Sequence, residues 1–169
     1  MKNLILVRHA KSSWDFPELS DFERPLNSRG KVNAPEMGAR LKKQMIIPDL
    51  ILASPAERAL KTAEFIAAEI GYPPARIQKD RSLYHADYRT FLHVLHGIKD
   101  EFNIVMLVGH NPGLTDLACD IGDQFIDNIP TSGIVGIGLP IGSWHYADHG
   151  TTLFFDYPRN TSQVSYRLH

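Results

Sequence analysis

Three short polar segments of the sequence contain residue types that can bind and transfer an anionic group. They are Arg8-His9-Ala10, Ser54-Pro55-Ala56-Glu57-Arg58 and Gly109-His110-Asn111-Pro112. A guanidinium group can hold two phosphate oxygens at once, and an imidazole can act as a nucleophile or as an acid-base group. Taken one at a time, these residues have ordinary explanations as loop, helix-cap or solvated side chains. Brought together by the fold, they would form a phosphoryl-transfer site.

Each of these segments directly follows a short aliphatic run that is typical of a buried strand. The runs are Leu4–Val7, Leu50–Ala53 and Ile104–Val108. Helical patterns lie between them, and this alternation predicts a mainly parallel sheet covered on both faces, a three-layer α/β/α sandwich. Gly133–Leu139 and Thr151–Tyr157 predict two more strands that pair antiparallel at one edge. Because ligands of such sheets bind beyond the carboxyl ends of the strands, we expect the three polar segments to converge there.

The clearest helical pattern runs from Pro55 to Ile70. We expect Ser54 to cap this helix and Glu57 to complete a capping box with it. Three further helices are predicted: one from Asn27 or Ser28 with Met45 on its buried face, one after a cap at Asp87, and one after Asn111-Pro112. These helices would supply the two outer layers.

The composition fits one domain, residues 1–169, that is large enough to bury a core. Lys and Arg number 18 against 19 Asp and Glu, and the net charge of −1 provides no overall field for nucleic acid or an anionic membrane, so we expect to find neither partner. The apolar runs are too short to span a bilayer. The single cysteine, Cys119, and an N-terminus unlike a signal peptide predict a cytoplasmic protein.

Paired histidines are also common metal ligands. In this sequence, however, two guanidinium groups would flank the histidines and repel a divalent cation, and neither histidine motif contains a carboxylate. We therefore expect no metal ion and no other cofactor.

The three segments together resemble the sequence blocks of the histidine phosphatase superfamily, which includes phosphoglycerate mutases and acid phosphatases. Arg8-His9-Ala10 is similar to the strand-end Arg-His dipeptide of the family, with alanine where glycine is usual. The stretch from Leu52 to Ala63 is similar to the second block, and Val108-Gly109-His110-Asn111-Pro112 is similar to the third. The blocks occur in family order, and the resemblance implies a phosphoglycerate mutase-like fold.

The resemblance also implies roles for individual residues. His9 would be the nucleophile that becomes phosphorylated, and Arg8, Arg58 and His110 would bind the transferred phosphoryl group. Water would then attack phospho-His9 and release phosphate, so the implied activity is that of a phosphatase that needs neither a metal nor a nucleotide.

Within the superfamily, the short length and the block Arg24-Pro25-Leu26-Asn27-Ser28-Arg29-Gly30 are most similar to the small phosphohistidine phosphatases of the SixA type. Arg24 would then be either a second-tier phosphate ligand or part of a structural salt bridge. The segment Asp15–Asp21 is too short to form a lid, so we expect an open site that admits a phosphorylated protein. Trp14 would either line this site or anchor its loop by burial.

Two other functions stay open: a small-molecule phosphomonoesterase of the same superfamily, and a module that binds a phosphorylated partner without turnover. Relatives that cleave alkyl phosphates have a carboxylic acid before the third helix, where this chain has Tyr84, His85 and then Asp87. We expect Asp87 to cap the helix rather than to donate a proton. Phosphohistidine is therefore the preferred substrate, because its imidazole leaves readily once its other nitrogen is protonated.

Overall fold

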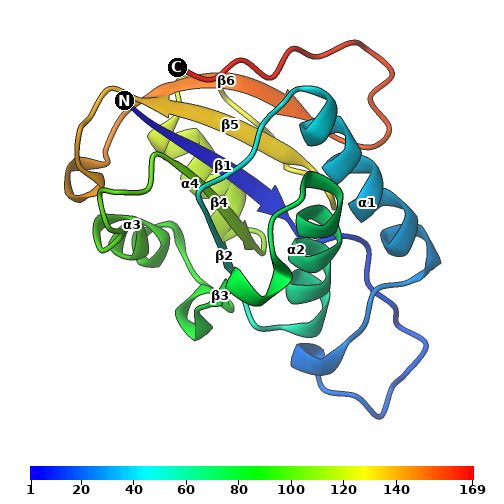
Figure 1. The fold of residues 1–169 in the computed structure, drawn as a ribbon. Helices are drawn as coiled ribbons and strands as arrows, with labels where there is room; N and C mark the ends of the chain where they lie inside the picture. Colours follow the sequence, from blue (N-terminus) through cyan, green and yellow to red (C-terminus); the bar gives the residue numbers. More distant parts are fainter.

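The computed structural model describes residues 1–169, in which a six-stranded sheet lies between two layers of helices (Figure 1). The strands are β1 (Lys2–Arg8), β2 (Leu50–Ala53), β3 (Gln78–Lys79), β4 (Ile104–Gly109), β5 (Ile134–Leu139) and β6 (Thr151–Asp156). The helices are α1 (Ser28–Lys43), α2 (Glu57–Ile70), α3 (Tyr88–His96) and α4 (Gly113–Ile121). Short 3-10 turns occur at Asp21–Glu23, Pro74–Arg76, Arg81–Leu83 and Trp144–Tyr146.

The strand order β3-β2-β4-β1-β5-β6 confirms the predicted sheet. β1, β2, β3 and β4 pair in parallel, whereas β5 pairs antiparallel with both β1 and β6. The strand that runs against the others is therefore β5, one place in from the edge. The hydrophobic pattern did not predict β3, because both of its residues are polar and exposed.

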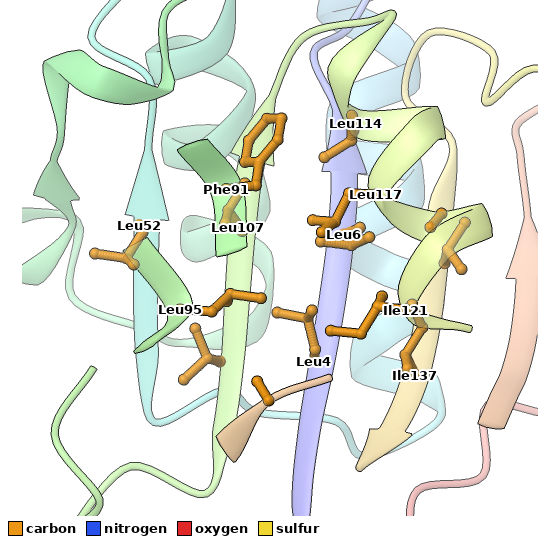
Figure 2. Close-up of a cluster of buried hydrophobic side chains, with 14 of the residues drawn as sticks. Leu4, Leu6, Leu52, Phe91, Leu95, Leu107, Leu114, Leu117, Ile121 and Ile137 are labelled. Atoms are coloured by element: carbon orange, nitrogen blue, oxygen red, sulfur yellow. The ribbon is translucent and has the colours of Figure 1, made fainter. Parts of the chain in front are cut away.

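Alternation along β1 divides the core into two layers, because successive side chains of a strand point to opposite faces. Leu4 and Leu6 pack with the apolar side chains of α3 and α4, as Figure 2 shows. Ile5 and Val7 pack with those of α1 and α2 on the other face. All four side chains are fully buried. The three-layer α/β/α architecture is thus confirmed.

Most predicted helix starts are confirmed. The Asn27 side chain caps α1 by accepting a hydrogen bond from the Gly30 N–H at 2.9 Å. Asp87 likewise caps α3 by accepting from the Thr90 N–H at 2.9 Å. The predicted helix after Asn111-Pro112 is α4. None of the helices combines the length and the apolar character that crossing a membrane would require.

Two details of the helix predictions are wrong. Helix α1 ends at Lys43, and Met45 is 87% exposed with a φ of 58°, so it does not contribute to the core. Helix α2 begins at Glu57 with Ala56 as an N-cap residue that lacks a side-chain cap, so Ser54 forms no capping box. The Ser54 hydroxyl instead accepts a hydrogen bond from the Ala56 N–H at 3.3 Å, just before the first helical residue, and lies 2.7 Å from His110 Nε2.

Gly30 allows the first turn of α1 to touch the loop that follows β1. The Lys11 carbonyl oxygen accepts a hydrogen bond from the Asn27 N–H at 2.9 Å. A Cβ atom on Gly30 would lie 2.2 Å from that same oxygen, well inside van der Waals contact. Because Gly30 has no side chain, α1 can lie directly against the segment next to His9.

We predict that Gly30→Ala lowers the free energy of unfolding by about 1–3 kcal/mol, the usual cost of forcing an extra methyl group into a packed contact. Gly142→Ala is a matched control, because a Cβ atom there would meet nothing within 4 Å. We expect the control to change stability by less than about 1 kcal/mol. Chemical denaturation of both variants measures the difference, and equal stabilities would show that the Gly30 contact relaxes without cost.

Candidate active site

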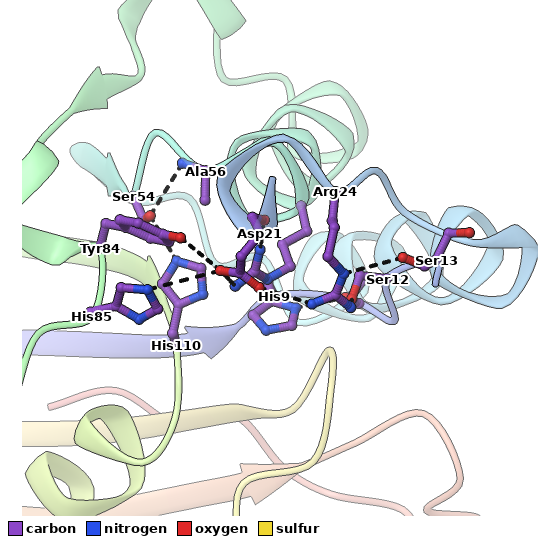
Figure 3. Close-up of polar contacts among 12 residues, drawn as sticks. His9, Ser12, Ser13, Asp21, Arg24, Ser54, Ala56, Tyr84, His85 and His110 are labelled. Atoms are coloured by element: carbon purple, nitrogen blue, oxygen red, sulfur yellow. Dashed lines mark hydrogen bonds and ion pairs between the residues drawn. The ribbon is translucent and has the colours of Figure 1, made fainter. Parts of the chain in front are cut away.

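The register between neighbouring strands brings the three polar segments to one edge of the sheet. Arg8 pairs with Gly109 across β1 and β4, and Ala53 pairs with Val108 across β2 and β4. The next residue in each segment is therefore His9, His110 or Ser54. The His9 and His110 ring centroids are 5.1 Å apart, and the residues are only 8% and 5% exposed. The predicted convergence of these segments is confirmed (Figure 3).

His9 is a neutral imidazole with a defined tautomer. The pKa of His9 is lowered to about 3, chiefly by burial and also by the positive charges of Arg58, Arg8 and Arg24, whereas a hydrogen bond to the Ala10 backbone opposes the shift. Its Nδ1 lies 2.8 Å from the Ala10 carbonyl oxygen, which can only accept a hydrogen bond. Nδ1 therefore carries the proton, and the lone pair of the ring is on Nε2.

Thr62 connects the loop after His9 to helix α2. Its hydroxyl accepts a hydrogen bond from the Ala10 N–H at 2.8 Å and donates one to the Arg58 carbonyl at 2.7 Å. Thr62 is fully buried. The side chain thus couples the backbone that follows His9 to the backbone of Arg58.

His110 is also neutral and keeps one nitrogen unpaired. Burial lowers its pKa to about 3, and the nearby His9 and Arg58 contribute in the same direction. Its Nε2 lies 2.7 Å from the Ser54 hydroxyl, whereas its Nδ1 is buried without any hydrogen-bond partner. A buried polar atom without a partner is costly, so Nδ1 is available to a ligand at the site.

Two arginines beside His9 lie in different electrostatic environments. Arg8 donates from Nη1 to the Ile129 carbonyl at 3.0 Å, while its buried Nε has no partner. Burial lowers the pKa of Arg8, and the positive charge of Arg58 adds to that effect. Arg8 makes no ion pair, but Arg58 is paired with Asp21 at 3.0 Å. The site therefore has an excess of positive charge, which favours an anionic ligand.

Asp21 is a site residue that the sequence did not reveal. Its carboxylate accepts hydrogen bonds from Arg58 Nη2 at 3.0 Å, from Arg24 Nη1 at 3.0 Å and from the Tyr84 hydroxyl at 2.7 Å. Burial alone would raise the pKa of Asp21, but the bonds from Tyr84, Arg58 and Arg24 outweigh it and hold the pKa well below its usual range. The sequence held one signal for the ion pair of Asp21 with Arg24: the two residues are three positions apart, so one helical turn brings them together.

Arg24 forms the expected ion pair, with Asp21, and its positive charge also lowers the pKa of His9. The role of Arg24 as a phosphate ligand stays a prediction. Its Nε donates to the Ser13 carbonyl at 3.2 Å, and its Nη2 donates to the Ser12 hydroxyl. The guanidinium group stacks on Trp14, with its carbon 3.3 Å from the ring centroid. Trp14 itself is 76% exposed, so the idea that it anchors its loop by burial is wrong.

The segment before α3 places two side chains at the site and directs a third elsewhere. The rings of Tyr84 and His85 lie 5.6 and 6.5 Å from that of His110. Asp87 caps α3 by accepting a hydrogen bond from the Thr90 N–H. This bond lowers the pKa of Asp87, so its carboxyl group stays ionised. Asp87 is thus a cap, as expected.

No cluster of three or more histidine, cysteine, aspartate or glutamate side chains is arranged as a metal site. The assembled groups are the neutral His9 imidazole with a free lone pair, two buried nitrogens without partners, Arg8 Nε and His110 Nδ1, and several guanidinium groups. Such a set can hold a phosphoryl group while a nucleophile attacks it.

The chain belongs to the histidine phosphatase superfamily (branch 1), whose family model matches residues 4–101. An uncharacterized chloroplastic protein of Arabidopsis thaliana is 33% identical over 125 residues, which is 69% of this chain and 57% of that protein. The aligned part thus spans little more than half the length of that relative.

Two solved structures of SixA proteins are similar to this chain over nearly its whole length. The structure of the protein histidine phosphatase SixA in complex with tungstate has a TM-score of 0.80 at 22% identity, covering 92% of this chain and 96% of that one. A proposed phosphohistidine phosphatase SixA from Agrobacterium tumefaciens has a TM-score of 0.78 at 29% identity, covering 93% and 98%. The fold is that of the SixA-like members, and the chain is a phosphatase of this superfamily.

We predict that Asp21→Asn strengthens orthophosphate binding about two- to tenfold, because the substitution removes a negative charge that competes for Arg58 and Arg24. Asp15→Asn is the matched control, since Asp15 is exposed on the same loop and makes no ion pair. Calorimetric titration measures both dissociation constants. Weaker binding by Asp21→Asn alone would mean that the carboxylate chiefly positions the two guanidinium groups.

We predict a pH dependence of stability that comes from His9 and His110. Their pKa values are about 3 in the folded protein and about 6.5 when unfolded, so between about pH 6.5 and 3 the unfolded chain binds these protons and the folded protein does not. The free energy of unfolding should therefore fall as the pH drops through this window, with each histidine adding up to about 1.4 kcal/mol per pH unit. Denaturation of His9→Gln/His110→Gln should show a shallower slope, and an unchanged slope would contradict the assignment.

Proposed function

We propose that the protein removes phosphate from phosphohistidine in a protein substrate, through a phosphorylated His9 intermediate and without a metal ion or cofactor. The observation that carries this proposal is the tautomer of His9. A neutral ring that donates its Nδ1 proton to Ala10 has an unprotonated Nε2, the form that attacks phosphorus.

The first step transfers the phosphoryl group to His9. The Nε2–P bond forms as the P–N bond of the substrate breaks, and the substrate imidazole leaves as a neutral ring when its other nitrogen is already protonated. Arg8 and Arg58 would balance charge on the equatorial oxygens. The unpaired Arg8 Nε would donate a hydrogen bond to those oxygens, and His110 Nδ1 would donate another in the tautomer whose Nε2 accepts from the Ser54 hydroxyl. Arg24, which is paired with Asp21, would add positive charge near the phosphoryl group.

The second step returns the enzyme to its starting state. A water oxygen attacks the phosphorus, the P–Nε2 bond breaks, and phosphate leaves with the proton of the water passing to phosphate or to solvent. His9 regains its lone pair on Nε2. The hydrogen bond from Nδ1 to Ala10 holds the ring in the same orientation in both steps.

The lack of a suitable carboxylic acid favours phosphohistidine over alkyl esters. An alkoxide must be protonated as it leaves, but Asp87 is held ionised by its capping bonds and Asp21 by its ion pairs. Phosphohistidine has no such need. A proposed protein substrate also fits the exposed aromatic rings of Trp14 and Phe16, 76% and 46% exposed, on the loop that supplies Asp21.

A small-molecule phosphomonoesterase is the second candidate, and the place of Tyr84 and His85 favours it. His85 Nε2 lies 3.9 Å from the Asp21 carboxylate, and its ring contacts that of Tyr84 with centroids 3.9 Å apart. In this second candidate, His85 would donate the proton to the leaving alkoxide, the role that the carboxylates do not fill. A cytoplasmic location for either activity remains a prediction.

A substrate panel with a metal chelator present tests the proposal. We predict fast hydrolysis of a phosphohistidine peptide, slower hydrolysis of phosphotyrosine, whose phenolate is a fair leaving group, and the slowest hydrolysis of phosphoserine and 3-phosphoglycerate. His9→Ala should abolish turnover of all four while orthophosphate still binds.

The controls separate the two candidates. Asp87→Asn keeps a good helix cap, so it should leave the panel unchanged. Phosphoserine turnover as fast as that of phosphohistidine, lost on His85→Gln, would establish the phosphomonoesterase instead. Residual hydrolysis by His9→Ala, or no acid-labile phosphoenzyme on rapid quenching, would exclude the covalent mechanism.

A further inference from the structure

A cleft of about 280 Å³ adjoins the His9 site and is lined by four positively charged residues. They are Arg8, Lys11, Arg29 and Arg159. No aspartate or glutamate lines the cleft, although acidic residues outnumber basic ones in the whole chain by 19 to 18. The accumulation of one sign of charge is therefore a local feature of this cleft.

The cleft charges are not compensated by the protein. Lys11, Arg29 and Arg159 are exposed, and none of them takes part in an ion pair or a side-chain hydrogen bond. Like charges around one cavity repel one another, and a concave site lined by a single sign concentrates its field on a ligand of the opposite sign. The ligand that would relieve this repulsion is an anion.

The backbone holds these side chains around the cleft from separate parts of the fold. Lys11 and Arg29 are kept together by the close contact of Gly30 with the Lys11 carbonyl. The turn that carries Arg159 is held by a hydrogen bond from the Asn160 N–H to the Tyr157 carbonyl at 3.0 Å, and by Arg40, which donates to the Pro158 carbonyl at 2.9 Å. The arrangement is thus anchored at both sides.

A second, larger cavity shows the opposite arrangement. It measures about 540 Å³ and is lined in part by Glu36, Arg40 and Asp156. Here Arg40 pairs with Glu36 at 2.8 Å and with Asp156 at 3.1 Å, so the charges are already balanced. In the smaller cleft, by contrast, every charged side chain is positive and none of them forms an ion pair.

Arg8 connects the cleft to the proposed chemistry, because it lines the cleft and also lowers the pKa of the adjacent His9. We propose that the cleft is an anion subsite that binds a second acidic group of the substrate, a carboxylate or a phosphate, beside the phosphoryl group held at His9. This inference rests on the proposed function for the identity of the first group. The second group would come from acidic side chains that flank a phosphohistidine, or from a further phosphate of a small molecule.

A pair of phosphohistidine peptides tests the first source. The peptides differ only in their flanking residues, Asp and Glu in one and Asn and Gln in the other. We expect the wild type to prefer the acidic peptide in kcat/KM, and the triple variant Lys11→Gln/Arg29→Gln/Arg159→Gln to reduce that preference about three- to thirtyfold, mainly through KM. Lys31→Gln is the matched control, because Lys31 is exposed on the same helix as Arg29 but does not line the cleft.

Calorimetric titration with orthophosphate and with tripolyphosphate tests the second source and needs no turnover. The triple variant should lose several-fold more affinity for tripolyphosphate than for orthophosphate, and added salt should shrink the difference in the wild type. If no phosphohistidine peptide is hydrolysed, the proposed function fails, yet this titration still decides the subsite. The proposal would be overturned if the wild type did not prefer the acidic peptide and the triple variant lost the same affinity for both phosphates. It would also be overturned if Lys31→Gln changed peptide preference and phosphate affinity as much as the triple variant does.

Discussion

The pairing of β1 with β4 is the constraint on which the site depends. Parallel pairing with Arg8 opposite Gly109 makes His9 and His110 neighbours at the point where both strands end. A shift of one residue would exchange the buried side chains of β1 between the two apolar layers, and each layer would then have to repack around side chains of a different shape. The same apolar packing that stabilises the sheet therefore sets the 5.1 Å separation of the two imidazole rings.

Burial then gives these rings their chemical character. Desolvation and nearby guanidinium groups keep both histidines neutral, and one carbonyl, that of Ala10, selects the tautomer of His9. Thr62 links that segment to the Arg58 backbone, so the nucleophile and an anion-binding group are positioned by one buried hydroxyl. Preorganised polar groups of this kind need little rearrangement during a reaction.

The loop between β1 and α1 shapes the surroundings of the site on two sides. On one side, its Asp21 lies between Arg24 and Arg58 and partly balances their charge. On the other, its Lys11 faces the cleft where no acidic side chain is present. A ligand with two anionic groups would thus meet a partly balanced pair of arginines in one place and unpaired cations in the other, with Arg8 between the proposed subsites.

Much of the fold and part of the site could be predicted from the sequence. Aliphatic runs and helix caps at Asn27 and Asp87 predicted the layers, because such patterns act over a few residues. The motifs predicted His9, Arg8, Arg58 and His110 at one sheet edge, where the structure places them.

Contacts between distant segments decided the rest. Ser54 has the local signature of a helix cap, but it bonds His110, which lies 56 residues further along the chain. Asp21 looks like an ordinary loop carboxylate until the fold brings Arg58 and Tyr84 to it. The cleft likewise combines side chains from β1, α1 and the segment after β6. Local sequence determines which element forms, whereas the hydrogen bonds and charges that a side chain meets depend on which elements the tertiary packing brings beside it.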